Sequence, residues 1–348
     1  MQSFLDIPRT FGHQPPELGA TLAQIDTARG QEQMFADQMP ELLHQLSEHA
    51  RIASITASNA IEGVVLPTER AQRIAEGSPS FRNRNEKEFA GYRDAIDWLL
   101  RQPTQEPVSI PFVLHLHRML FHHADGRGGY LKTEDNLIAS RESGTREIVF
   151  TPPPWQKTEF LLTELIDRYK TAKASQAAHP MVLISALVLD FLAIHPVIDG
   201  NGRLARLLTT HELLSQGYGV ARYVSVEQRI FESKNTYYAT LYESQREWHE
   251  AAHSIWPWTT YLARILADSY EDFEQRVLAA GSASGGKQGR VRDYILGQSP
   301  PEFRRRDIER ALPGVSTATI RLVLNELRDT GQIALQGSGP GARWQRRP

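Results

Sequence analysis

Cysteine is absent from the 348 residues of this chain, which excludes disulfide bonds and thiolate metal sites. A long hydrophobic run is absent as well: the most apolar segment, residues 181–194, contains Asp190 and is too short to span a bilayer. The first residues form neither a basic segment nor an extended apolar one, so no export signal is visible. We therefore expect a cytoplasmic protein without a membrane partner, because a chain without cysteine suits a reducing compartment.

A large net charge is also lacking, since the formal charge is −2 at pH 7. The positive and negative residues are, however, unevenly distributed along the chain. Residues 287–348 hold twelve Lys and Arg against six Asp and Glu, a net charge of +6 that leaves −8 for the remainder. The stretch Gly281–Gly286 before them has the composition of a flexible linker. We expect an N-terminal helical region at 1–100, a central domain at 101–280 and a separate domain at 287–348.

Helical periodicity dominates the chain before this linker, and no internal repeat is visible. With 41% hydrophobic and 23% charged residues, the chain can bury one large core or two or three smaller ones. The sequence therefore predicts a mainly α fold. The expected helices are Leu22–Leu46, Glu86–Leu100, Pro111–Phe121, Thr158–Ala172, Met181–Ile194, Leu204–Ser215, Ser233–Gln245 and Trp256–Val277.

The basic tail predicts a small domain of its own. Three short helices are followed by a hairpin around a glycine-rich turn, expected at 291–296, 306–312, 316–330 and 331–344. This order resembles a winged helix, in which Ser316 caps the third helix and Thr317, Thr319 and Arg321 lie near its exposed start. The resemblance implies DNA binding through the major groove or, with equal weight, a docking or dimerisation module.

The segment at residues 195–206, with the sequence HPVIDGNGRLAR, carries the strongest chemical signal of the chain. The apolar helix before it must end here, because the residue before Pro196 is pushed out of helical geometry. His195 therefore lies at a helix exit. Histidine is the side chain best suited to accept a proton near neutral pH, so this position predicts a general base.

The residues after His195 predict a site for a phosphate. Residues 200–202, Gly-Asn-Gly, can adopt positive φ and present successive N–H groups where a new helix begins, and a helix N-terminus binds anions. Arg203 and Arg206 are three apart, so they share one helix face and can reach the same negative charge. Asp199 would repel a bare phosphate, but Mg²⁺ can bridge the two, since it takes one or two carboxylates plus substrate phosphates.

This block resembles the signature of Fic domains, His-Pro-Phe-x-Asp/Glu-Gly-Asn-Gly-Arg-x-x-Arg. Only Val197 departs from it, because the family has Phe there, a residue that packs beneath the loop; no reactive group is lost. The resemblance implies transfer of AMP from ATP to a Ser, Thr or Tyr hydroxyl of a target protein, with His195 as the base and Asp199 holding Mg²⁺. The signature residues that it implies in nucleotide binding are Asp199, Gly200, Asn201, Gly202, Arg203, Leu204, Ala205 and Arg206.

An upstream segment, Ser58 to Gly63, resembles the inhibitory Ser-x-x-x-Glu-Gly motif of many Fic proteins. Ser58 and Glu62 share a helix face and Gly63 is a natural stop, so Glu62 lies at the helix C-terminus, the unfavourable end of the dipole for a carboxylate. Taken alone, this placement does not indicate a function, because an exposed Glu at a helix C-terminus costs only tenths of a kcal/mol. The resemblance implies that Glu62 pairs with Arg206 and keeps it from the γ-phosphate. In some relatives the same Glu serves removal of AMP.

A hairpin is predicted where two short apolar segments flank the polar turn 141–146 and prolines 152–154 close the second. In Fic domains such a hairpin is a flap that aligns the target segment by strand pairing, although an ordinary surface hairpin would look the same. Tyr237, Tyr238 and Gln245 fall on a helical stretch where Fic proteins contact the nucleoside; otherwise the tyrosines would be core residues. The flap residues implied in nucleotide binding are Leu137, Ile138, Ala139 and Ser140.

Two other functions stay open. One is a DNA-binding regulator whose Fic fold senses nucleotide, but the intact His195 argues against it, because a sensor needs no base. The other is Fic-type transfer of a different phosphate-containing group, although the complete Gly-Asn-Gly and both arginines favour AMP from ATP. The target protein, a homodimer and the direction of the reaction are not decided by the sequence. Four histidines lack carboxylates at metal-ligand spacing and are expected in packing or on the surface: His115, His117, His122 and His123.

Overall fold

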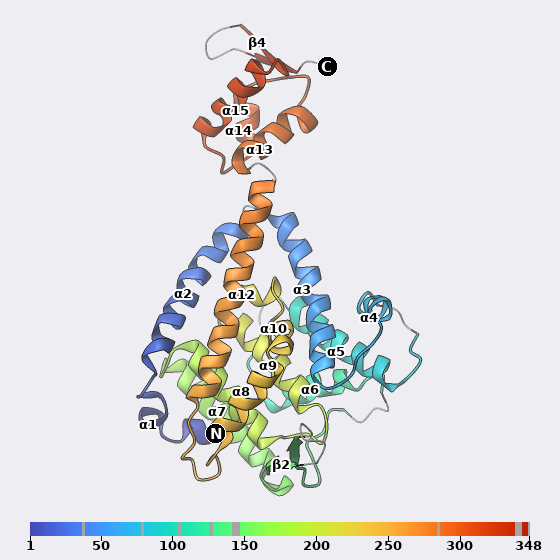
Figure 1. Cartoon of the computed structure of the whole chain (residues 1–348), viewed down its shortest axis with the longest axis vertical. Helices are drawn as coiled ribbons and strands as arrows, with labels where there is room; N and C mark the ends of the chain where they lie inside the picture. The colour runs from blue at the N-terminus through green and yellow to red at the C-terminus, as the bar shows by residue number, and fades with distance from the viewer. Residues whose placement is uncertain are drawn as a thin grey trace. The chain divides into compact units, whose positions relative to one another are not determined.

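A computed structural model describes residues 1–36, 39–77, 80–102, 106–124, 128–140, 147–283, 286–337 and 343–346 (Figure 1). The chain divides into two compact units. The larger unit comprises Met1–Gln33 and Leu43–Phe273, and the smaller unit comprises Met34–Leu42 and Glu274–Pro348.

The larger unit is built almost entirely of helices. It begins with the short 3₁₀ turn η1 (Gln2–Phe4), and two further turns, η2 (Trp155–Lys157) and η3 (Gly219–Arg222), connect later elements. Its α-helices are α1 (Ile7–Phe11), α2 (Pro16–Ala36), α3 (Pro40–Ile61), α4 (Thr68–Ala75), α5 (Arg84–Arg101), α6 (Ile110–Leu120), α7 (Thr158–Ala174), α8 (Pro180–Ile194), α9 (Asn201–Ser215), α10 (Val226–Glu232), α11 (Lys234–Gln245) and α12 (Trp256–Ala283). The end of α2, the start of α3 and the last part of α12 belong to the smaller unit.

Helix α8 lies at the centre of this unit. Every residue from Met181 to Ile194 is buried, because the helix has no polar face and packs between α7 and α9. Asp190, the one charged residue of this stretch, accepts hydrogen bonds from Ser3 and from the indole N–H of Trp248 at 2.7 Å. Within the described parts of the chain, no helix combines the length and the apolar character needed to cross a membrane.

Most of the predicted helices are confirmed to within a few residues, but the single helix Leu22–Leu46 was wrong. Helix α2 ends at Ala36 and a new helix, α3, begins at Pro40. A proline lacks the N–H that an interior helical position needs, yet it suits the first turn, where that N–H would have no partner. The apolar pattern of the sequence is therefore helical on both sides of the break, which is why one helix was predicted where there are two. Residues 37 and 38 lie outside the described part of the chain.

The expected hairpin is present between α6 and α7. Strands β1 (Ile138–Ser140) and β2 (Glu147–Phe150) pair antiparallel, with Ile138 opposite Phe150 and Ser140 opposite Glu147. The register shifts between Ile138 and Ala139. The predicted turn, residues 141–146, lies outside the described part of the chain. The hairpin places Ile138 and Ala139 beside the end of α8, where the candidate site lies.

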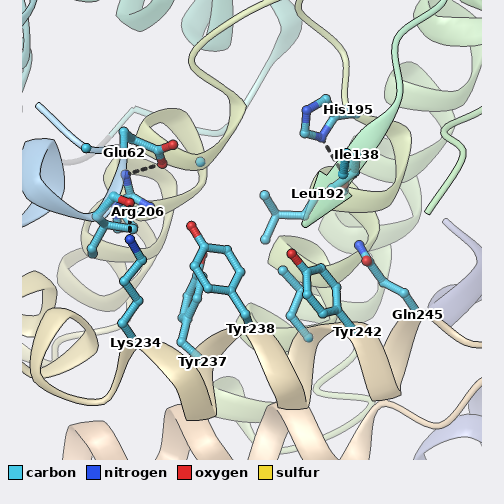
Figure 2. Close-up of a pocket in the computed structure, with 15 residues that line it drawn as sticks. Glu62, Ile138, Leu192, His195, Arg206, Lys234, Tyr237, Tyr238, Tyr242 and Gln245 are labelled. Carbon is cyan, nitrogen blue, oxygen red and sulfur yellow. Dashed lines mark hydrogen bonds and ion pairs between the residues drawn. The ribbon is translucent and has the colours of Figure 1, made fainter. Parts of the chain in front are cut away.

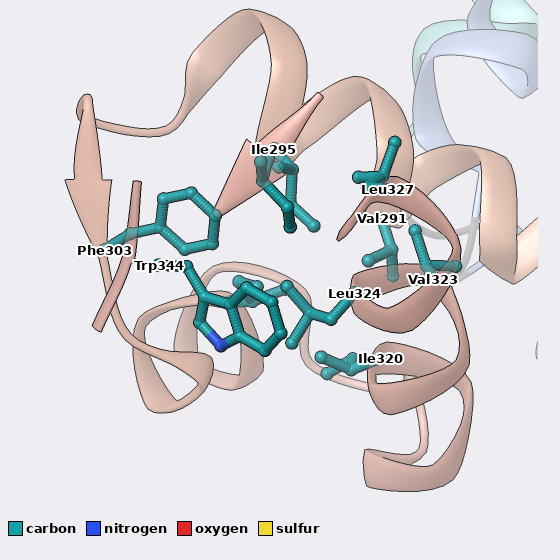
Figure 3. Packing of buried hydrophobic residues seen from close by; sticks show 10 residues of the cluster. Val291, Ile295, Phe303, Ile320, Val323, Leu324, Leu327 and Trp344 are labelled. Carbon is teal, nitrogen blue, oxygen red and sulfur yellow. The ribbon is translucent and has the colours of Figure 1, made fainter. Parts of the chain in front are cut away.

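The smaller unit has its own apolar core and a three-stranded antiparallel sheet in the order β3-β5-β4 (Figure 3). Trp344 of β5 and Phe303 of β3 pack against Ile295 and the inner face of α15. The predicted cap is confirmed, because Ser316 Oγ accepts the N–H of Thr319 at 3.2 Å. The elements are α13 (Gly286–Asp293), the π-helical turn η4 (Tyr294–Gln298), β3 (Glu302–Phe303), α14 (Arg305–Ala311), α15 (Thr317–Asp329), β4 (Ile333–Gln336) and β5 (Arg343–Arg346).

The predicted order of three helices and a hairpin agrees with these elements, and β3 is an addition that the sequence reasoning missed. The flexible linker expected at Gly281–Gly286 is partly helical, because its first three residues continue α12 up to Ala283. Gly286 already belongs to α13. Residues 284 and 285 lie outside the described part of the chain.

Candidate active site

A pocket of about 630 Å³ opens in the larger unit where the ends of α3 and α8, the start of α9, strand β1 and helix α11 meet (Figure 2). Its wall combines charged, aromatic and backbone groups from segments far apart in the sequence. Figure 2 shows the side chains of α11 rising toward the pocket, with the Glu62–Arg206 pair at one end and His195 at the other. The lining residues are Ile61, Glu62, Gly63, Ile138, Ala139, Leu192, His195, Gly202, Arg206, Lys234, Tyr237, Tyr238, Leu241, Tyr242 and Gln245.

His195 caps the C-terminus of α8 in a left-handed conformation, with φ 52° and ψ 61°. Its backbone N–H donates to the carbonyl of Phe191 at 3.0 Å, and its ring Nδ1 lies 3.1 Å from the carbonyl of Leu192. A carbonyl oxygen can only accept, so Nδ1 carries the proton and Nε2 is left as the basic nitrogen. Burial lowers the pKa of His195 to about 4. The imidazole is therefore neutral at physiological pH and able to take up a proton.

The loop after His195 is held by its own side chains. The side-chain amide of Asn201 accepts the N–H of Val197 at 3.1 Å and donates to the carbonyl of Val197 at 2.7 Å. Val197 itself is fully buried, so the smaller apolar residue takes the inward position that Phe has in the Fic signature. Gly200 has φ 89°, and a Cβ there would lie 3.1 Å from the ring of Phe121. The sequence of the loop thus determines its shape before any ligand binds.

The start of α9 presents backbone N–H groups at the place where the sequence predicts an anion cradle. The first N–H groups of a helix have no carbonyl of their own helix to donate to, and here the ladder begins only with the bond from Leu204 N–H to the carbonyl of Gly200, at 2.9 Å. A Cβ built on Gly202 would overlap Oε1 of Glu62. The carboxylate of Glu62 therefore lies against Gly202, in the first turn of α9, where the helix dipole favours negative charge.

The predicted pair of Glu62 and Arg206 is present. The guanidinium of Arg206, 2% exposed, donates to Oε1 of Glu62 at 2.7 Å and to the hydroxyl of Ser58 at 2.8 Å. Burial by itself raises the pKa of Glu62, but the guanidinium of Arg206 outweighs it and the net pKa is lowered. Helix α3 ends at Ile61, and Gly63 follows with φ 83°, as the motif predicted. One carboxylate thus pairs with Arg206 and lies against Gly202.

Arg203 does not line the pocket. Its side chain is buried, donates to Glu88 Oε2 at 2.9 Å and lies over the ring of Phe121 at 5.3 Å. Asp199 is more accessible, with 55% of its side chain exposed, and its oxygens lie 3.6 Å from Arg84 and 3.7 Å from Arg203. The two signature arginines therefore have different surroundings: Arg206 faces the pocket, and Arg203 supports the loop from behind.

Some of the remaining predicted residues line the pocket and others do not. Tyr237, Tyr238 and Gln245, which were predicted to contact the nucleoside, all line it. The side-chain amide of Gln245 is buried, and neither its nitrogen nor its oxygen has a hydrogen-bond partner within the described residues. Such an orphaned amide requires a ligand or water to satisfy it. Leu204 and Ala205 are core residues, Leu137 borders a second pocket of about 480 Å³, and the side chain of Ser140 lies outside the described part.

Lys234 is a pocket residue that sequence reasoning missed. Its ammonium donates to the carbonyl of Ile61 at 2.8 Å, the last residue of α3. The cation therefore stabilises the C-terminus of the helix that carries the inhibitory motif. Nothing local to Lys234 signals this role, because the two residues are 173 positions apart in the sequence.

The overlap at Gly202 makes a prediction for stability. We expect Gly202→Ala to lower the free energy of unfolding by about 1–3 kcal/mol, because the new methyl group must displace the paired Glu62 carboxylate. Gly30→Ala is the matched control, since a Cβ on this residue of α2 meets no atom within 4 Å; it should raise stability by about 0.5–1 kcal/mol. Urea denaturation measures both. In a Glu62→Gly background the cost of Gly202→Ala should shrink, and an equal cost in both backgrounds would contradict the overlap.

Comparisons with known proteins agree with this geometry. Residues 107–213 match the model of the Fic/DOC family. The "Protein adenylyltransferase Fic" of Drosophila yakuba is 25% identical over 181 residues, which cover 51% of this chain and 34% of that protein. The Drosophila melanogaster protein of the same name is 24% identical over the same share of this chain and 35% of its own length. The chain therefore matches only about a third of these curated relatives.

Two solved structures share the fold. A Fic family protein from Desulfovibrio desulfuricans has a TM-score of 0.61 at 22% identity, and the match covers 96% of this chain and 97% of that one. A Fic domain containing signaling protein from Bacteroides thetaiotaomicron has a TM-score of 0.61 at 20% identity, over 76% of this chain and 98% of that one. The family match thus shows a Fic/DOC domain at residues 107–213, which contain the signature loop, and the two solved structures show that the fold is shared.

Proposed function

We propose that this protein transfers AMP from ATP to a Ser, Thr or Tyr hydroxyl of a protein. One observation carries the proposal: a neutral histidine, Gly202 of the expected cradle and an unsatisfied amide line the same pocket. His195 supplies the base, the start of α9 supplies N–H groups for a phosphate, and Gln245 supplies donors and an acceptor for a nucleoside base. The Drosophila relatives are named adenylyltransferases, which supports the same reaction.

The proposed reaction needs little covalent chemistry from the protein. The target hydroxyl gives its proton to Nε2 of His195 while its oxygen attacks the α-phosphorus of ATP. A new P–O bond to the target forms, the bond to the β-phosphate oxygen breaks, and pyrophosphate leaves. The N–H groups at the start of α9 stabilise the negative charge on the α-phosphate in the transition state. Positioning and electrostatic stabilisation do the remaining work.

The residues present fit Mg²⁺ as a companion of the nucleotide. Asp199 offers an accessible carboxylate at the edge of the cradle. Within the described residues, no group of three or more acidic or histidine side chains could hold a metal ion by itself. Mg²⁺ is commonly held by one or two carboxylates plus substrate phosphates, so Asp199 would hold it only together with ATP. When bound, the ion supplies positive charge against the phosphates.

We further propose that Glu62 restrains the reaction. Its carboxylate lies over Gly202, where the cradle would otherwise receive an anion, and it occupies the guanidinium of Arg206. A triphosphate brings several negative charges into the same space, so the carboxylate and the γ-phosphate compete for one cation. The same carboxylate is a candidate for orienting a water molecule during removal of AMP, and the proposal includes that reverse reaction.

The position of the label in ATP tests the type of group transferred. With the Glu62→Gly variant, we expect label from α-labelled ATP to become attached to protein, whereas γ-labelled ATP should leave protein unlabelled because pyrophosphate is released. The measurement is gel autoradiography of the purified protein and of a cell lysate. Label from the γ-phosphate would indicate phosphate transfer instead. No label from either, despite ATP binding, would favour a regulator that senses nucleotide.

A second candidate function concerns the smaller unit, for which we propose a winged helix that binds DNA. The exposed side chains of Thr317 and Arg321 lie at the start of α15, and Arg305, Arg306 and Arg310 are exposed on α14. Residues 287–348 carry a net charge of +6. A basic face beside the N-terminal part of a helix is the arrangement that docks a recognition helix on phosphates.

Fluorescence anisotropy with a labelled DNA duplex and the full chain tests this second proposal. We expect binding that weakens with salt, and Arg321→Ala should weaken it about tenfold. Arg101→Ala, an 80% exposed arginine of α5, is the matched control and should leave binding unchanged. Absence of salt-dependent binding would favour a docking or dimerisation module, and sedimentation of the full chain would then report a dimer.

A further inference from the structure

A buried lysine lies beneath the catalytic loop. Lys132, 3% exposed, directs its ammonium to the carbonyls of Ile194 at 3.1 Å and Pro153 at 3.0 Å and to the side-chain oxygen of Asn136 at 3.1 Å. All three acceptors are neutral. Burial lowers the pKa of Lys132 to about 8. The charge of Asp135 offsets only part of the cost of burying this ammonium, so the buried lysine points to a role that a neutral side chain would not fill.

Asn136 extends the contact to the loop itself. Its side-chain NH₂ donates to the carbonyl of Val197 at 3.1 Å and to that of His195 at 3.4 Å. The backbone N–H of Lys132 donates to the carbonyl of Pro196 at 2.8 Å. The four consecutive carbonyls of residues 194–197 therefore all accept from Lys132 or Asn136.

These bonds hold a backbone that is strained by itself. A non-glycine residue in the left-handed region costs about 1 kcal/mol or more and persists only when its surroundings impose it. His195 is such a residue, and the four carbonyls around it are the ones that Lys132 and Asn136 hold. The same side chains tie this loop to the hairpin, because Asn136 precedes β1 and Pro153 follows β2.

We propose that Lys132 and Asn136 are positioning residues, which fix the main chain that presents His195 and couple it to the hairpin. This inference rests on the proposed transfer reaction, in which His195 is the base. Neither residue belongs to the signature loop or to the inhibitory motif.

Lys132 also acts on His195 through its charge. Besides burial, the charged groups that affect the imidazole are Lys132, from the segment before β1, which lowers its pKa, and Glu62, from the end of α3, which raises it. A positive charge near the ring opposes its protonation. Removing the ammonium should therefore let His195 take up a proton at higher pH, a change that a purely structural role would not produce.

The first arm of the test is an NMR titration of His195 in the full chain, which needs no enzymatic activity. We expect Lys132→Met to raise the titration midpoint by about one pH unit, and Lys132→Arg, which keeps the charge, to stay close to wild type. Lys157→Met is the matched control, since Lys157 is exposed on η2. Asn136→Ala removes the link without removing the charge, so its midpoint should not move.

The second arm measures transfer in the Glu62→Gly background. Lys132→Met and Asn136→Ala should each lower kcat about tenfold to hundredfold at pH 8, where His195 is neutral in every variant, because a misplaced base attacks poorly. Lys132→Met should also move the acidic limb of the pH profile upward. Thermal melting shows whether each variant folds. If Lys132→Met does not fold, the kcat values of Lys132→Arg and Asn136→Ala test the positioning role instead.

A kcat equal to that of Lys157→Met in both variants would overturn the positioning role. An unchanged His195 midpoint in Lys132→Met would overturn the electrostatic one. If Glu62→Gly transfers nothing at all, the proposed function fails, while the NMR arm still decides whether Lys132 acts on His195. The two failures are therefore distinguishable.

Discussion

The Glu62→Gly variant should attach label from α-labelled ATP to protein about tenfold to hundredfold faster than wild type, the range that a coupling free energy of about 1–3 kcal/mol produces. The reason is competition at one place. In the wild-type structure the carboxylate lies over Gly202 and pairs with Arg206 at 2.7 Å. Glycine at position 62 removes the carboxylate, which leaves the cradle and the guanidinium to the phosphates of ATP.

Helix α3 should survive this change, because its other anchors remain. Ser54 donates to the buried carboxylate of Glu227 at 2.8 Å, and Ser58 still accepts from Arg206 at 2.8 Å. The gain in activity would therefore come from the lost carboxylate and not from a lost helix.

Glu69→Gly is the matched control for this prediction, since Glu69 is an exposed residue in the first turn of α4. It should leave the rate of labelling unchanged. Calorimetry should show tighter ATP binding in Glu62→Gly than in wild type. Equal rates in wild type and Glu62→Gly, with equal ATP affinity, would contradict the restraint.

The second large effect is expected from His195→Ala in the Glu62→Gly background. Transfer should fall by about a hundredfold to ten-thousandfold, the usual contribution of a general base. The structure shows which nitrogen this change removes. Nδ1 is bound to the carbonyl of Leu192, so Nε2 is the nitrogen available to the target hydroxyl, and burial keeps the pKa of His195 at about 4.

ATP binding should persist in this double variant, because in the proposed reaction the start of α9 and Arg206, rather than the imidazole, would hold the phosphate groups. His122→Ala, a change at an exposed histidine, is the control and should not affect transfer. The measurement is labelling from α-labelled ATP together with calorimetry of ATP binding. A variant that loses ATP binding to the same extent as transfer would assign His195 a structural role instead.

Much of the larger unit could be predicted from local sequence. The run from Met181 to Ile194 is apolar on every side, so it had to be a buried helix, and it is. Pro196 and Gly63 mark helix ends because of their own backbone chemistry. The join between α2 and α3 was missed for a related reason, since the apolar pattern continues across Pro40 although a new helix starts there.

The candidate site was only partly predictable. The signature loop identified His195 and the cradle, because the residues that build them lie within a short segment. Arg203 looked equivalent to Arg206 by spacing alone, yet Glu88 and Phe121 surround it behind the loop. Lys132 gave no signal of its contact with the loop, since its partners come from several distant segments.

The sequence by itself determined most of the helices, the end of α8 at the signature loop and the basic charge of residues 287–348, because these properties depend on each residue and its near neighbours. Only the tertiary structure decided which charges meet. Arg206 and Glu62 are 144 residues apart, and Arg203 and Glu88 are 115 residues apart. Each guanidinium is buried, so it must find an acceptor, but the packing of α3, α5 and α9 selects which carboxylate arrives there.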